Sequence, residues 1–137
     1  MAAPAFLTFV LVGATATALA GGSQRFGETC TGSETVQAAG QPPVRAAYAI
    51  ALSVDLANKL YCYAACGRNQ TYPVQDAGAS PIRLADVDTE QQMRRLSYDR
   101  RTSRLSDDQR ITLGPISVVR HARATCRPAA FRPPFQP

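Results

Sequence analysis

Tryptophan is absent from the sequence, and histidine and lysine each occur once, at His121 and Lys59. A single histidine rules out multi-histidine metal centres and leaves a hydrolytic nucleophile with only one imidazole base. No serine lies in a Gly-x-Ser-x-Gly turn, and no glycine-rich loop resembles those that bind phosphate. No apolar run reaches the roughly 20 residues that a membrane-spanning helix needs. These scarcities exclude several common enzyme classes, and we expect no metal and no cofactor.

The first 20 residues predict a secretory signal peptide. They carry no charged side chain, contain an apolar run from Phe6 to Val12, and end in Ala18-Leu19-Ala20, which resembles a signal-peptidase site. An uncleaved anchor and a misplaced start codon are the alternatives, although the run is short for an anchor. No cysteine lies near the predicted cleavage site, so the sequence does not indicate lipid attachment. We therefore expect residues 21–126 to form one domain in the periplasm or outside the cell, followed by a proline-rich tail at 127–137.

Four cysteines in an oxidising compartment usually form two disulfides, and the sequence allows three pairings. We favour a local bond between Cys62 and Cys66 and a long one between Cys30 and Cys126, which would tie the start of the domain to its end. A zinc site is the rival interpretation, but Cys-x-x-x-Cys spacing is unusual for zinc and His121 is the only histidine. A redox-active pair at Cys62 and Cys66 is disfavoured by its three intervening residues.

Basic residues outnumber acidic ones by 15 to 10, and all but one are arginines. A basic surface would attract anionic envelope polymers or nucleic acid. However, Asp99, Asp107 and Asp108 lie among the arginines and dilute their charge. Tyr98 is the only nearby aromatic residue that would stack on bases, so nucleic acid is disfavoured and a solvated, charged surface is the preferred interpretation. The arginine clusters are Arg94-Arg95, Arg100-Arg101 with Arg104, and Arg120-His121 with Arg123.

Alternation of side chains predicts β-strands. Between Ala46 and Leu56 every second residue is bulky, which is typical of a strand with one buried face. A helix over 44–56 is the alternative, because alanine is a poor strand former. Asp55 to Lys59 predicts a turn, and 60–63 the returning strand of a hairpin.

Further short strands are expected at 25–31, 82–87 and 116–125, with a loop over 67–81 and a turn signal at Gly114-Pro115 after 111–113. The segment from Leu96 to Ser106 resembles the hairpin at 52–61, with a strand, a turn that begins at Asp99 and a second strand. A helix over 89–96 is an alternative to strand structure there, because the segment contains Glu, Gln, Met and Arg, which favour helices. Prolines after residue 126 should end the sheet ladder. The predicted fold is all-β: a small, disulfide-stapled antiparallel sandwich or open barrel built from hairpins.

Two pairs of aspartates, Asp86 with Asp88 and Asp107 with Asp108, have the composition of acid–base pairs in glycosidases. Adjacent or alternate acids more often solvate turns. We interpret both pairs as turn residues.

Three features of the mature sequence form a pattern: Tyr61-Cys62 followed by Cys66, turns that begin with aspartate, and an ending that runs from Cys126 to two phenylalanines. In these features the chain resembles a group of small secreted, cysteine-containing β-rich proteins of GC-rich Gram-negative bacteria that have no assigned activity. The resemblance implies an all-β, disulfide-containing fold and supplies no catalytic residue. A fainter likeness is to periplasmic lysozyme inhibitors, small β-barrels with cysteines comparable to Cys30 and Cys126, from which the extra cysteine pair departs.

The leading functional hypothesis is a non-enzymatic, exported binding or envelope-associated module, whose partner is a protein or an anionic envelope polymer. The alternatives are a periplasmic enzyme, either a hydrolase that uses His121 or a thiol–disulfide catalyst that uses Cys62 and Cys66, and a lysozyme-type enzyme inhibitor. Tyrosine and arginine are enriched at binding hot spots. The candidate contact residues are therefore Tyr61, Tyr63, Arg68 and Tyr72.

Overall fold

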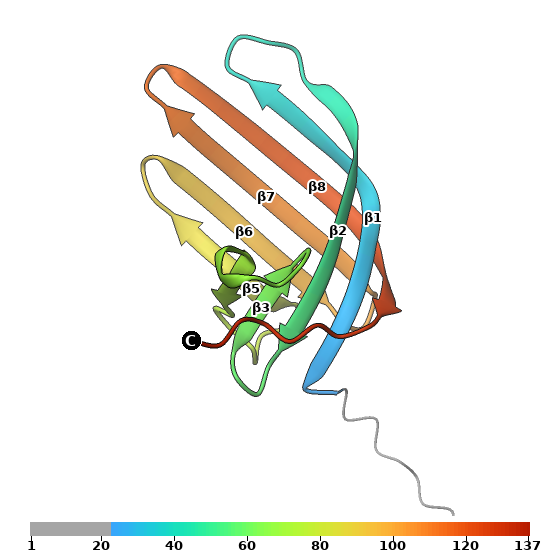
Figure 1. Cartoon of the computed structure of the whole chain (residues 1–137). Coiled ribbons are helices and arrows are strands. Elements are labelled where there is room, and N and C mark those ends of the chain that lie inside the picture. Colours follow the sequence, from blue (N-terminus) through green and yellow to red (C-terminus); the bar gives the residue numbers. More distant parts are fainter. Residues whose placement is uncertain (1–22) are drawn as a thin grey trace, which may run out of the picture.

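The structure, a computed structural model, describes residues 23–137. The predicted signal peptide, residues 1–20, lies outside the described residues. The described chain is all-β, as the sequence predicts: eight antiparallel strands form one sheet, in the order β4-β3-β2-β1-β8-β7-β6-β5. This sheet curls into a nearly closed barrel (Figure 1).

Most strands join their sequence neighbours through hairpins, and β1 lies between β2 and β8. A single 3-10 turn, η1 (Arg68–Gln70), precedes β4. The strand bounds are β1 Arg25–Ala38, β2 Val44–Asp55, β3 Leu60–Tyr63, β4 Thr71–Pro73, β5 Ile82–Asp88, β6 Gln92–Asp99, β7 Arg104–Leu113 and β8 Ile116–Ala129.

The barrel has two distinct ends. The turns after β1, β5 and β7 lie at one end, which we call the hairpin end (Figure 1). The turns after β2 and β6 lie at the opposite end, which we call the base, where β1 begins and β8 finishes. The C-terminal tail leaves β8 at the base and crosses outside β1 and β2 (Figure 1).

The hydrophobic core lies inside the barrel in its base half. Successive strand side chains point to opposite faces, so the predicted bulky series of β2 turns inward. Tyr48, Leu52 and Val54 of that series are buried and pack with Leu96 of β6 and Leu105 of β7. Side chains from both halves of the sheet therefore meet in one core.

Toward the hairpin end the same inner face is open to solvent. Its apolar residues include Val44, which is 62% exposed, and Leu113, which is 70% exposed. They share a strand face with buried residues, since strand side chains repeat every second position. The remaining exposed large apolar residues are Val87, Ile111 and Ile116.

The first and last strands of the domain are joined covalently. Cys30 lies opposite Cys126, with their Cα atoms 3.9 Å apart, and the predicted disulfide between them is present. Close approach of the backbones continues at Gly27, where a Cβ atom would lie 2.5 Å from the carbonyl oxygen of Ala130. Any side chain at this position would clash with the backbone of the tail, so the position requires glycine. The predicted Cys62–Cys66 disulfide is also present and closes the loop after β3.

Several predicted elements differ from the observed ones. The alternative helix over 89–96 is wrong, because most of that segment belongs to β6, which pairs with β5 and β7. The predicted loop at 67–81 contains β4, which pairs with β3. Strand β8 also continues to Ala129, and Pro128 lies in register with Glu28, so the prolines end the ladder three residues later than predicted.

Candidate functional site

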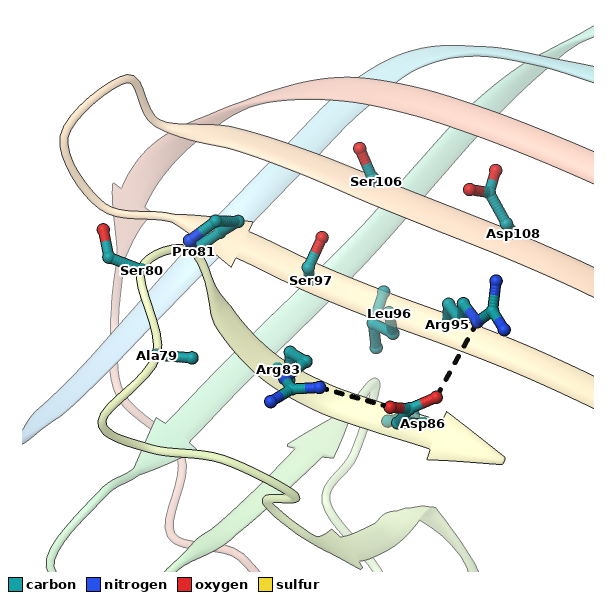
Figure 2. Close-up of a pocket in the computed structure, with 11 residues that line it drawn as sticks. Ala79, Ser80, Pro81, Arg83, Asp86, Arg95, Leu96, Ser97, Ser106 and Asp108 are labelled. Carbon is teal, nitrogen blue, oxygen red and sulfur yellow. Dashed lines mark hydrogen bonds and ion pairs between the residues drawn. The ribbon is translucent and has the colours of Figure 1, made fainter. Parts of the chain in front are cut away.

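A hollow of about 760 Å³ lies on the outer face of β5, β6 and β7 (Figure 2). One wall is the loop before β5, whose shape depends on Asp76. The carboxylate of Asp76 accepts hydrogen bonds from the backbone N–H groups of Gly78 and Ala79, at 3.1 and 3.0 Å. Aspartate commonly stabilises turns in this way. The loop then places Ser80 and Pro81 beside the sheet surface.

Strand alternation and register build the floor of this outer hollow. Residues of β5, β6 and β7 that point outward lie side by side in two rows across the strands. One row aligns Arg83, Ser97 and Ser106, and the next aligns Asp86, Arg95 and Asp108. The first row offers two hydroxyl groups, and the second alternates in charge.

The charged groups of the outer hollow largely neutralise one another. Asp86 lies 3.5 Å from the guanidinium of Arg83 and 3.8 Å from that of Arg95 (Figure 2). Asp108 binds Arg123 of β8 at 2.7 Å. Burial alone would raise the pKa of Asp108, but hydrogen bonds from Arg123 and His121 hold it below its usual value. Asp108 is therefore an anion that supports its neighbours.

Ser97 and Ser106 lie opposite each other on β6 and β7, and both residues are half-buried. Within residues 23–137 neither hydroxyl has a side-chain hydrogen bond in the structure, so both are available to a ligand. Hydroxyls both donate and accept. With arginine donors and aspartate acceptors beside them, the outer hollow presents both halves of a hydrogen-bonding site.

His121, the candidate catalytic base, lies next to this hollow on β8. Its Nδ1 atom is 2.9 Å from Asp108, and its side chain is 55% exposed. Ser106 lies opposite Arg123 in the register, and Arg123 is two residues from His121 along β8. A nucleophile must lie within hydrogen-bond reach of its base, and no serine hydroxyl bonds His121 in the described residues. The structure thus contains an oriented imidazole without a paired nucleophile.

Three of the four predicted contact residues lie together at the edge formed by β3 and β4. The rings of Tyr61 and Tyr72 stack at 5.6 Å, as do those of Tyr63 and Tyr72. The hydroxyl of Tyr72 donates to the carbonyl oxygen of Asn69, so the hydroxyl of Tyr63 donates to Tyr72. Burial raises the pKa of Tyr61 to about 12. The hydroxyls of Tyr63 and Tyr72 therefore bond within the protein, and the ring of Tyr61 is buried beside them.

Arg68, the fourth predicted contact residue, belongs to a different contact. Its guanidinium lies 5.0 Å from the ring centroid of Phe135, in the C-terminal tail. Arg68 and Tyr72 both line a hollow of about 390 Å³ beside that ring. The tail therefore occupies part of the surface that the sequence assigned to a partner.

The Cys62–Cys66 disulfide lies beneath the same tail. Cys62 is fully buried and Cys66 is 8% exposed. Arg132 bonds residues nearby: its guanidinium donates to the carbonyl oxygen of Ala64, and its backbone N–H donates to the side-chain hydroxyl of Ser53. A disulfide catalyst needs a sulfur that a thiolate can approach. Burial under the tail favours a structural role for this bond.

A polar cluster inside the barrel was missed by sequence reasoning. The predicted turn pair Asp107 and Asp108 instead lies within β7, so the two carboxylates point to opposite faces. Asp107 is buried and binds Arg94 of β6, while Tyr48 of β2 donates to it at 3.1 Å. Gln109 also donates to Asp107. The alternation of β7 around buried Leu105 would have indicated an inward Asp107.

Asp86 and Asp88, the other predicted turn pair, both lie within β5 and bind arginines. No group of three or more His, Cys, Asp or Glu residues suited to a metal ion occurs in residues 23–137. The same part of the chain has no helix that is long and apolar enough to span a membrane. Comparisons of the chain with protein-family models, with curated proteins and with solved structures gave no match.

Proposed function

We propose that the chain is an exported, non-enzymatic binding module that holds a small polar ligand in the outer hollow. The observation that carries this proposal is the pairing of two unbonded hydroxyls, Ser97 and Ser106, within a hollow whose charges are balanced. Two disulfides support export, because disulfides persist in oxidising compartments.

Charge balance argues for a ligand with little net charge. The floor carries Arg83 and Arg95 against Asp86 and Asp108, so neither an anion nor a cation gains a large electrostatic advantage. A neutral sugar or a zwitterionic peptide supplies both donors and acceptors to match. Such a ligand also avoids leaving buried polar groups unpaired, which is costly.

Hydrolysis at His121 is the alternative with the most support, because Asp108 orients the imidazole at 2.9 Å. A general base needs a substrate proton or a nucleophile within reach. The absence of a serine bonded to His121 among the described residues argues for a structural hydrogen bond to Asp108. Replacing His121 with Ala should therefore leave ligand binding and cellular function unchanged.

The thiol–disulfide alternative is disfavoured by the burial of Cys62 and Cys66. The inhibitor alternative rests on the faint likeness to periplasmic lysozyme inhibitors. Purified protein added at micromolar concentration to a lysozyme lysis assay tests it, and an unchanged rate of lysis removes it.

The proposed function is tested by nuclear magnetic resonance with the disulfide-bonded protein. Neutral disaccharides and zwitterionic dipeptides are titrated as defined probes, and the backbone amide signals of Ser97 and Ser106 are followed. A bound probe should shift these signals, and Ser97→Leu should abolish the shifts. Ser117→Leu, also on the outer face but near the hairpin end, is the matched control. No shift at either serine with any probe, or chemical conversion of a probe, would contradict the proposal.

A further inference from the structure

Ion pairing leaves unneutralised positive charge at the base of the barrel. Besides Arg132 in the C-terminal tail, five exposed basic side chains there have no acidic side chain within 4.0 Å among the described residues. The turn from β6 to β7 supplies two of them, and the first residue of β7, the β2–β3 turn and the last residues of β8 supply one each. They are Lys59, Arg100, Arg101, Arg104 and Arg127, which we call the basic base.

Acidic residues near the base cancel only part of this charge. Asp55 is buried and already binds Arg25 at 3.0 Å. The side chain of Thr102, backbone N–H groups of the β6–β7 turn and the charge of Arg101 lower the pKa of Asp99, which is one negative charge among these arginines. Glu28 is 8% exposed and accepts a hydrogen bond from Tyr98 inside the core. By contrast, the arginines of the outer hollow are paired with aspartates.

Two hollows flank the β6–β7 turn and give the basic base a shape. One, of about 270 Å³, is lined by Arg100 and Arg101. The other, of about 410 Å³, is lined by Arg104 and Arg123 together with hydroxyl-bearing residues of β1, β7 and β8. Guanidinium groups bind carboxylate, sulfate and phosphate through paired N–H donors, and hydroxyls add further donors.

The arrangement favours one class of anionic partner. Nucleic acid binding uses exposed aromatic rings for stacking, but Tyr98 is 2% exposed and Arg100 lies 4.6 Å above the ring of Phe26. A membrane surface combines basic and apolar contacts on one side of a protein. Here the exposed apolar residues, such as Val44 and Leu113, lie at the hairpin end, opposite the basic base.

We propose that the basic base binds an acidic polysaccharide, a polymer whose sugars carry carboxylate, sulfate or phosphate groups. Successive anionic groups would contact the two hollows on either side of the β6–β7 turn. This inference rests on the proposed binding role, and the larger flanking hollow adjoins the outer hollow at Ser106. Ser97 lines neither of the two hollows beside the β6–β7 turn. Ser97→Leu should therefore abolish small-ligand shifts and leave polysaccharide binding intact.

The test measures binding of the disulfide-bonded protein to polygalacturonate and dextran sulfate, with neutral dextran as the uncharged probe. The variant Arg101→Gln/Arg104→Gln removes two charges from the basic base. Arg45→Gln/Arg68→Gln removes the same charge from β2 and η1, where neither arginine has an acidic partner among the described residues. Thermal unfolding of both variants confirms that the fold persists.

We expect Arg101→Gln/Arg104→Gln to weaken binding of the acidic polysaccharides at least about tenfold. The matched control, Arg45→Gln/Arg68→Gln, should weaken binding much less. Binding should also weaken as salt concentration rises. If both variants weakened binding equally, net charge alone would explain the effect, and the proposal would be overturned. Equal binding of neutral dextran would also overturn it, as would tighter binding of single-stranded oligothymidine or of phosphatidylglycerol vesicles.

Discussion

Arg94 of β6 and Asp107 of β7 form a two-point ion pair inside the barrel. The Nε and Nη2 atoms of Arg94 lie 3.2 and 3.1 Å from the two carboxylate oxygens of Asp107. Burial alone would lower the pKa of Arg94, but the hydrogen bonds and charge of Asp107 raise it. The pair lies where the hydrophobic core gives way to the open inner face. Within residues 23–137, Asp107 accepts side-chain hydrogen bonds from Arg94, Tyr48 and Gln109.

Removing one partner of this pair should strongly destabilise the protein. Arg94→Met leaves the buried carboxylate of Asp107 without its cation and should cost about 3–5 kcal/mol in urea unfolding. Arg94→Met combined with Asp107→Leu should cost less than the single change, because no buried charge remains. Arg95→Met, on the outer face with a side chain that is 63% exposed, is the control and should cost at most about 1 kcal/mol. A double variant less stable than Arg94→Met would contradict this account.

The two disulfides should contribute unequally to stability. Cys30 and Cys126 are 96 residues apart, whereas Cys62 and Cys66 are four apart. Because a longer loop restricts the unfolded chain more, replacing Cys30 and Cys126 with Ala should cost about 4–5 kcal/mol, and replacing the local pair about 2 kcal/mol. Guanidinium unfolding of the two double variants measures both values. The reverse order would show that native packing, and not loop closure, dominates.

Alkaline conditions should unfold the protein through its buried tyrosines. Burial raises the pKa of Tyr61 to about 12, and burial with the hydrogen bond to Glu28 raises that of Tyr98 to about 12. Above about pH 10 the unfolded chain loses these protons while the folded chain keeps them, so stability falls as pH rises. Phenolate absorbance should therefore increase together with the loss of sheet circular dichroism. Tyr61→Phe should move the alkaline midpoint upward; ionisation of Tyr61 near pH 10 in the intact fold would refute the prediction.

Acid should weaken the fold partly through Asp55. Burial alone would raise its pKa, but Asn58 and Arg25 donate to its carboxylate and lower it. Stability from this group is present above its unfolded pKa of about 3.9 and is lost as pH falls through the lower folded value. Asp55→Asn should cost about 1–3 kcal/mol at neutral pH and less at low pH. Asp88→Asn, at a 57% exposed side chain, should change stability by about 0.5 kcal/mol or less.

Elements with a strong local pattern were predictable from sequence. The alternation between Ala46 and Leu56 predicts β2 because a strand repeats every second residue. The segment 89–96 was ambiguous, since Gln, Met and Arg favour helices. Pairing with neighbours on both sides decides it, because strands gain their stability from cross-strand contacts.

The candidate site was predictable only in part. Tyr61 and Tyr63 share a face because they are two residues apart, but their contact with Tyr72 depends on the pairing of β3 with β4. Ser97 and Ser106 meet through the β6–β7 hairpin, whereas Arg123 joins them from β8. Arginines adjacent in sequence, such as Arg94 and Arg95, are separated to opposite faces. Adjacent charged residues in a strand therefore do not form one charged patch on the surface, although they form a cluster in the sequence.

The sequence by itself determined the strand periodicity, the turn positions and which side chains share a face, because these follow from neighbouring residues along the chain. Only the tertiary structure decided that β1 lies beside β8, that Arg94 finds Asp107, and that uncancelled positive charge gathers at the base. Those outcomes depend on which distant strands pair and in which register. Register is set by contacts across the whole barrel, and no local pattern specifies it.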